Sequence, residues 1–224
     1  MAGGQGVTAE SGQAEIGLTA VELLASRLCH DLVGPVGAIG NGLELLAEET
    51  SRFSDETVAM VTQSAERTAA LVALFRAAFG AAGSKAGFGL GEAQAVMIDL
   101  LAGSKTTLDW PEETQPGPVG AAKLVLNLLL VANEALPRGG VIAVRTDLSN
   151  GFGVTVSARG VGARLTSEVQ AALDPSVAPG TLSTRSIHAY FAAHLCRRQQ
   201  ANLKVEAGQD QVRLSAREPP QPGE

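Results

Sequence analysis

The sequence predicts an α+β protein in which a helical hairpin is followed by an α/β sandwich domain. Across residues 16–80, apolar residues recur at spacings of three and four, which is the repeat of an amphipathic helix. Across residues 92–217, helical patterns alternate with short runs rich in β-branched residues. The glycine-rich stretch at 81–91 predicts a linker between the two parts. We expect residues 1–15 and 218–224 to form disordered tails.

The hairpin is expected to form half of a dimeric four-helix bundle. Its first helix should begin at Thr19, which forms a capping-box pattern with Glu22, and Ser54 should cap the second helix. Two helices alone cannot close a core around such wide apolar stripes, so a second copy would complete it. The alternative is that the hairpin packs on the C-terminal half of its own chain. The stripes comprise Val21, Leu24, Leu28, Leu32, Val36, Ile39, Leu43 and Leu46 in the first helix, and Val58, Val61, Ala65, Thr68, Val72, Phe75 and Phe79 in the second.

The second part contains the elements of one mixed sheet with helices. Strands and helices in this order predict a sandwich with the helices on one face of the sheet, and Asn150-Gly151 favours a hairpin between two strands. The expected helices are 92–102, 119–136, 166–173 and 186–200, and the expected strands are 107–110, 141–147, 152–159, 203–207 and 211–216.

Composition excludes several classes of function. The net charge of -6 argues against a nucleic-acid surface, which needs clustered Lys and Arg. No apolar run approaches the ~18 residues of a membrane span, and the N-terminus has no signal pattern, so we expect a cytoplasmic protein without membrane contact. Cys29 and Cys196 form no CxxC motif, and no metal site is expected.

His30 is the candidate catalytic residue. At about 100° per residue it lies on the face of the first helix opposite the apolar stripe, so it should face water. Arg27, Gly34, Gly37 and Asn41 are its neighbours on that outer face, and the glycines leave room for a partner. An ordinary surface histidine on a glycine-weakened helix is the alternative.

Two halves of the sequence resemble the bacterial sensor histidine kinases. His30-Asp31-Leu32-Val33-Gly34-Pro35 is similar to their phosphoacceptor box, which lies on the first helix of a dimeric bundle. The segment NLLLVA at 127–132 stands where these kinases carry an Asn motif that holds Mg-ATP, and ARGVG at 158–162 stands in place of an Asp-x-Gly-x-Gly motif. The resemblance implies a kinase-type ATPase-like domain after the hairpin.

The nucleotide motifs depart from the kinase pattern. Val131 replaces the Asn that ligates magnesium, and an isopropyl group offers no lone pair to a hard cation. Ala158 replaces the acidic residue that reads adenine. Instead of a second glycine-rich motif, the chain has TLSTRSIHAYFAAH, which cannot form a glycine-rich phosphate cradle. We therefore expect a degenerate domain that binds neither ATP nor another cofactor.

A kinase-like body with a histidine and without a nucleotide site resembles the histidine phosphotransferases of phosphorelays. The resemblance implies that His30 accepts a phosphoryl group from a receiver-domain aspartate of a hybrid histidine kinase and passes it to response regulators. Specifically, it implies the alphaproteobacterial cell-cycle relay from CckA to CtrA and CpdR, with magnesium supplied by the receiver.

Five residues near His30 and two rival functions complete the functional hypothesis. Asp31 would orient the imidazole or act as acid or base, and Arg27 could steer an acidic receiver. Gly34, Gly37 and Asn41 would contact the partner. A non-catalytic dimeric adaptor derived from a histidine kinase is the main alternative, and an active kinase with an unusual nucleotide site is another.

Overall fold

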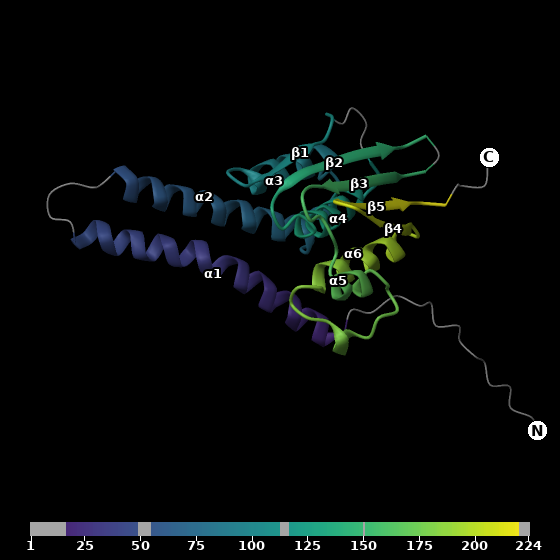
Figure 1. Ribbon diagram of the computed structural model, residues 1–224, viewed down its shortest axis with the longest axis horizontal. Coiled ribbons are helices and arrows are strands. Elements are labelled where there is room, and N and C mark those ends of the chain that lie inside the picture. The colour runs from purple at the N-terminus through teal and green to yellow at the C-terminus, as the bar shows by residue number, and fades with distance from the viewer. Residues whose placement is uncertain (1–16, 49–54, 113–116, 150, 220–224) are drawn as a thin grey trace, which may run out of the picture.

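The computed structural model describes a long helical hairpin joined to a sheet domain (Figure 1). It covers residues 17–48, 55–112, 117–149 and 151–219. The expected tail at 1–15 and the expected cap at Ser54 lie outside these ranges. Within them, no helix has the length and apolar character needed to cross a membrane.

The hairpin consists of α1 (Leu18–Glu48) and α2 (Asp55–Ala78). Figure 1 shows it as an arm whose far end extends well beyond the sheet domain. The first helix begins one residue before the predicted cap, Thr19, and continues through Pro35 without interruption. Asp55 and Glu56 in the first turn of α2 complement its dipole.

The sheet domain confirms the predicted sandwich. Its five strands have the order β1-β2-β3-β5-β4, in which only the β1–β2 pair is parallel. Buried apolar residues alternate along β2, β3 and β5, and the helices cover that one face (Figure 1). The strands are β1 (Thr106–Asp109), β2 (Gly140–Asp147), β3 (Gly153–Arg159), β4 (Asn202–Gly208) and β5 (Gln211–Arg217), and the helices are α3 (Leu90–Leu101), α4 (Ala121–Glu134), α5 (Ser167–Ala172) and α6 (Ile187–Arg198), with short 3₁₀ turns η1 (Ala82–Ser84) and η2 (Pro179–Thr181).

Several predicted boundaries shift by one or two residues, and the largest differences lie in the predicted linker and the predicted C-terminal tail. The segment predicted as linker contains η1, in which Gly83 is buried, and α3 begins at Leu90 rather than at Glu92. The predicted C-terminal tail begins too early, because the backbone N–H of Glu218 donates to the Phe152 carbonyl and its carboxylate accepts from the Phe152 N–H. The early start of α3 goes with a local contact, in which the Glu92 carboxylate accepts from the Gly89 N–H, whereas the Glu218 contacts join residues far apart in the sequence.

The inner end of the hairpin packs on its own sheet domain. In the last three turns of α2, Leu71, Leu74, Ala77 and Ala78 are buried, and α2 contacts α3 and α4 of the sheet domain as well as α1. The ring of Phe79 meets Phe191 of α6 edge to face, with 5.4 Å between the ring centroids. The alternative of packing on the C-terminal half is therefore right for this end of the hairpin.

The predicted apolar stripes are only partly covered within the single chain. Val36 of α1 is 51% exposed and Val72 of α2 is 42% exposed, so the single chain does not fully cover the stripes, and whether a second copy covers them stays a prediction. The reason is geometric, because one neighbouring helix covers only part of a wide stripe. The exposed stripe residues are Val21, Val36 and Leu43 of α1 and Val58, Ala65 and Val72 of α2.

Close packing of α1 on α2 depends on Gly42. A Cβ placed there would lie 2.4 Å from Cγ2 of Val61, whereas a Cβ at Gly40 would meet no atom within 4 Å. Because Val61 is branched at Cβ, it has few other rotamers available. We expect Gly42→Ala to be less stable than the matched control Gly40→Ala by about 1–3 kcal/mol in free energy of unfolding. Urea denaturation measures the difference, and equal stabilities would contradict this account of the contact.

Candidate functional site

His30 stands on an open face of α1. Its side chain is 84% exposed, as expected from the helical pattern. Gly34 and Gly37 have no atom within 4 Å of an added Cβ, and Asn41 is also exposed. The spacing of these four residues places them on one side of the helix. They form a smooth and accessible surface around the imidazole, which we call the His30 face.

Asp31 lies beside the imidazole. Its Oδ1 is 3.2 Å from Nδ1 of His30, which is within hydrogen-bond distance when that nitrogen carries the proton. The same carboxylate accepts from Nε of Arg27 at 3.1 Å and 2.9 Å, one contact to each oxygen. Asp31 is therefore placed to orient the imidazole, which is one of the two roles predicted for it.

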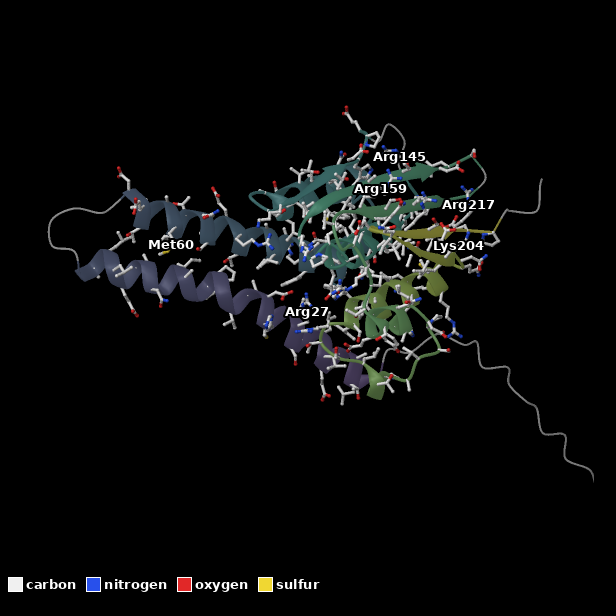
Figure 2. The ribbon with its side chains drawn as sticks, viewed as in Figure 1. Arg27, Met60, Arg145, Arg159, Lys204 and Arg217 are labelled. Carbon is white, nitrogen blue, oxygen red and sulfur yellow. The ribbon has the colours of Figure 1, made fainter. Side chains whose placement is uncertain are left out.

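Arg27 differs from the prediction that it lies free on the outer face. Its side chain is half-buried, and Nη1 donates to the Thr184 carbonyl at 3.3 Å. The same nitrogen lies 3.7 Å from Oε1 of Glu134 at the end of α4. Figure 2 labels Arg27 where α1 approaches the sheet domain. Its guanidinium is thus engaged within the chain, because the fold brings carbonyl and carboxylate acceptors to this side of α1.

Glu134 links Arg27 to a buried histidine of the sheet domain. Its second carboxylate oxygen forms a hydrogen bond with Nε2 of His188, a residue of α6 whose side chain is only 6% exposed. A cavity of about 270 Å³ adjoins these groups between the hairpin and the sheet domain, and Asp31, Arg27, Glu134 and His188 all line it. The fold therefore connects the site of His30 to the interior of the second domain.

The residue corresponding to the kinase Asn motif has a structural role in this chain. Asn127 is fully buried, and its amide donates to the carbonyls of Ala78, at the end of α2, and Lys123, both at 2.9 Å. Nζ of Lys123 donates to the carbonyls of Phe79 and Gly80. One face of α4 thus binds the C-terminal carbonyls of α2, which have no partner inside their own helix.

The other two positions at which the sequence departs from the kinase nucleotide motifs are buried as well. Val131 and Ala158 are both 0% exposed and belong to the hydrophobic core. Burial lowers the pKa of the Lys123 ammonium, and the charge of nearby Arg198 adds to the effect. These side chains belong to the packed interior of the sheet domain.

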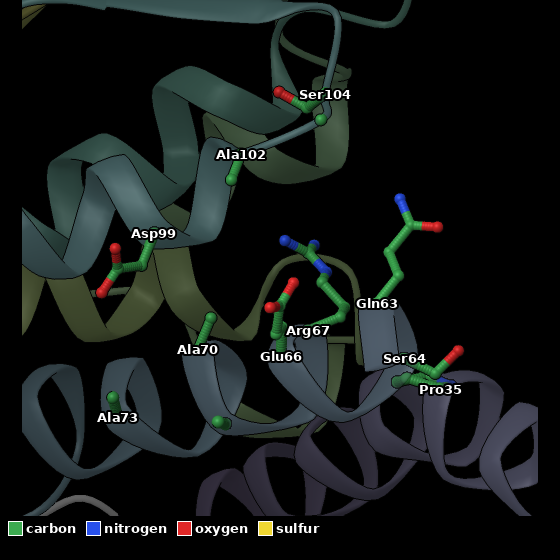
Figure 3. A pocket seen from close by; sticks show the side chains of 12 residues that line it. Pro35, Gln63, Ser64, Glu66, Arg67, Ala70, Ala73, Asp99, Ala102 and Ser104 are labelled. Atoms are coloured by element: carbon green, nitrogen blue, oxygen red, sulfur yellow. The ribbon is translucent and has the colours of Figure 1, made fainter. Parts of the chain in front are cut away.

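His30 does not line either of the two described cavities nearest to it. A groove of about 930 Å³ does lie between α2 and the turn after α3 (Figure 3), but of α1 only Pro35 contributes to its lining. Its walls are mainly alanines and polar side chains such as Gln63 and Asp99, and the guanidinium of Arg67 donates to the Leu100 carbonyl. An exposed imidazole on a convex helix suits a macromolecular partner better than a small substrate, which is usually held in a concave site.

Sequence patterns pointed to His30, Gly34, Gly37 and Asn41, which the structure brings together. They did not indicate Glu134 or His188, which join the site from two other helices. The spacing of seven between Asn127 and Glu134 places both on one face of α4. That spacing could have indicated that Glu134 and Asn127 share a surface of α4, but it does not indicate which residues of α1 and α6 would contact that surface.

Comparisons with known proteins agree with this arrangement. The family model of the histidine phosphotransferase C-terminal domain matches residues 90–211. The protein phosphotransferase ChpT of Brucella abortus (strain 2308) is 42% identical over 142 residues, which are 61% of this chain and 66% of the Brucella protein, so less than two thirds of that relative is aligned. The 1.7 Å structure of a bacterial phosphotransferase superposes with a TM-score of 0.76 at 30% identity and covers 90% of this chain and 97% of its own. The chain therefore belongs to the histidine phosphotransferase family.

Proposed function

We propose that this protein is the histidine phosphotransferase of a bacterial phosphorelay and that His30 carries the phosphoryl group. The exposure of His30, at 84% of its side chain and outside any described cavity, is the main observation in favour. A receiver domain must bring its phosphorylated aspartate into direct contact with the acceptor nitrogen. The small residues of the His30 face leave space for that approach.

The chemistry needs little from this chain besides a positioned nucleophile. A neutral imidazole, whose ordinary pKa is about 6.5, can attack an acyl phosphate at neutral pH. Phosphoryl transfer depends mainly on positioning and on neutralising the equatorial oxygens. The magnesium ion and the lysine of the receiver would supply that neutralisation, so this protein would need no cofactor or metal of its own.

Transfer without ATP is part of the same proposal. The buried positions of Asn127, Val131 and Ala158 support it, because these residues stand where kinases hold Mg-ATP. The relatives found by comparison carry phosphotransferase in their names, which also fits a protein that receives its phosphoryl group from another protein.

The relay that we infer is the cytoplasmic cell-cycle relay of alphaproteobacteria. The segment at 28–46, LCHDLVGPVGAIGNGLELL, resembles the corresponding segment of ChpT. The donor would be the receiver domain of the hybrid kinase CckA, and the acceptors would be the receivers of the response regulators CtrA and CpdR. The similarity to the Brucella protein supports this assignment.

A homodimer joined through the hairpins is the expected assembly. The exposed apolar residues of α1 and α2 are spaced as one helical stripe on each helix, and a second hairpin would cover them. We expect Val36→Glu combined with Val72→Glu to weaken dimerisation at least about a hundredfold, because an unpaired carboxylate in an apolar interface costs roughly 3 kcal/mol or more. Light scattering during gel filtration measures the mass. The control is Val161→Glu, an exposed valine outside the hairpin, and a mass that is unchanged in the double variant would contradict the interface.

The test of the function is a labelling experiment. The protein is incubated with a purified receiver domain carrying ³²P on its aspartate and, in parallel, with γ-³²P-ATP. We expect acid-labile label from the receiver and none from ATP. Label acquired from ATP would instead indicate a kinase. Absence of label from a panel of receivers would favour the non-catalytic adaptor.

A further inference from the structure

We propose that Glu134, held by His188, is a positioning residue for His30. It would act through Arg27 and Asp31, so that the sheet domain sets the orientation of the imidazole on the hairpin. This inference rests on the proposed function. It gives a role to the sheet domain, because the proposed function places the phosphoryl-accepting residue on the hairpin.

The contacts form an unbroken series from solvent to core. His30 meets Asp31 at 3.2 Å, Asp31 binds Arg27 at 2.9 Å, and Nη1 of Arg27 lies 3.7 Å from Glu134, which binds His188. Side-chain exposure falls along the series from 84% at His30 through 26–28% for the three middle residues to 6% at His188. Each group in the middle of the series therefore has a partner on both sides.

The helix alone would not hold Asp31 in place. Arg27 and Asp31 form an i,i+4 pair, and an isolated pair of this kind contributes only about 0.3–0.5 kcal/mol, so both side chains would sample other rotamers. Glu134 and the Thr184 carbonyl bind the far end of the Arg27 guanidinium. Glu134 is in turn held by His188, whose ring is buried in α6. The guanidinium of Arg27 is planar and rigid, so holding its Nη1 beside Glu134 also holds its Nε, and with it the carboxylate of Asp31.

A fixed Asp31 selects one form of His30. When the carboxylate accepts a hydrogen bond from Nδ1–H, the lone pair is on Nε2. In the transfer step, the Nε2 lone pair forms the new N–P bond while the P–O bond to the receiver carboxylate breaks and leaves its electron pair on that carboxylate. The proton stays on Nδ1, and the charge that develops on the ring faces the Asp31 carboxylate. A free side chain would spend part of its time in the other tautomer, with Nε2 protonated and unable to attack.

The test compares Glu134→Gln with Glu206→Gln. Glu206 is a matched control because it also pairs with two basic side chains, Lys204 and Arg213, and it lies on β4, away from the hairpin (Figure 1). Figure 2 shows Lys204 on the sheet, well away from Arg27. The first measurement is the tautomer of His30, read from the ¹⁵N chemical shifts of its ring at mildly alkaline pH. The second is the rate of phosphoryl transfer at saturating receiver.

We expect a clear shift of His30 from the Nδ1–H to the Nε2–H tautomer in Glu134→Gln, a rate of transfer about five- to tenfold lower, and an unchanged melting temperature. Arg27→Lys keeps the positive charge but lacks the planar guanidinium that contacts both carboxylates, so it should shift the tautomer in the same direction. An unchanged tautomer in Glu134→Gln, or an equal shift in Glu206→Gln, would overturn the proposal. The tautomer needs no receiver, so it tests positioning even if wild-type protein accepts no label, a result that would overturn only the proposed function.

Discussion

Replacement of His30 by glutamine is expected to abolish phosphoryl acceptance from a receiver domain, with a loss of at least about a thousandfold in the rate of labelling. An amide has no lone pair on nitrogen that can attack phosphorus, so the nucleophile is removed while the size of the side chain is nearly kept. The other two histidines cannot substitute, because His188 and His194 are buried in α6. Autoradiography of the protein after incubation with a ³²P-labelled receiver measures the effect.

The His30→Gln variant also carries its own control for folding. Because the side chain is 84% exposed and its polar contact is with the neighbouring Asp31, the substitution should change the free energy of unfolding by less than about 0.5 kcal/mol. A folded variant that still acquires acid-labile label would show that the acceptor lies elsewhere. In that case the exposed histidine on α1 would be an ordinary surface residue.

The second large effect is expected at Asn127, where leucine should lower the free energy of unfolding by about 1–3 kcal/mol. Leucine has nearly the same size but donates no hydrogen bond, so the Ala78 carbonyl at the end of α2 would lose its side-chain partner in a buried position. Lys123 would still hold the neighbouring carbonyls of Phe79 and Gly80. The hairpin should therefore loosen at this junction without complete unfolding of the sheet domain.

Urea denaturation of Asn127→Leu is compared with that of Asn202→Leu. The comparison separates loss of the hydrogen bond to Ala78 from the effect of an Asn→Leu replacement in general. Asn202 is exposed on β4, and leucine there should cost little. Equal stabilities of the two variants would contradict the role of Asn127 as the link between α4 and α2. Such a result would leave its buried amide without an explained function.

Local sequence patterns were sufficient to predict most of the elements. Alternation in VIAVRTD and FGVTVSAR predicted β2 and β3 to within one residue at each end, because one face of each strand is buried and the other is polar. The exposed position of His30 followed from the same reasoning applied to a helix. These features depend only on which face of an element is apolar, and the sequence carries that information directly.

Contacts between distant segments could not be predicted in this way. Periodicity placed Arg27 on the outer face of α1, but the fold brings Glu134 of α4 and the Thr184 carbonyl to it and so turns it inward. Periodicity predicted the apolar stripes, but how much of each stripe is covered within one chain depends on where the neighbouring helices lie. The ordering of Glu218 by Phe152 likewise depends on the sheet bringing together residues 66 positions apart.

The central claim is that His30 holds a phosphoryl group in transit between two receiver domains, and a chase experiment tests it most directly. The protein is labelled by a ³²P-receiver, separated from it, and mixed with an unlabelled second receiver and magnesium. The account predicts that the label leaves the protein and appears on the aspartate of the second receiver. Label that stays on the protein, or that is released only as inorganic phosphate, would contradict the role of a relay.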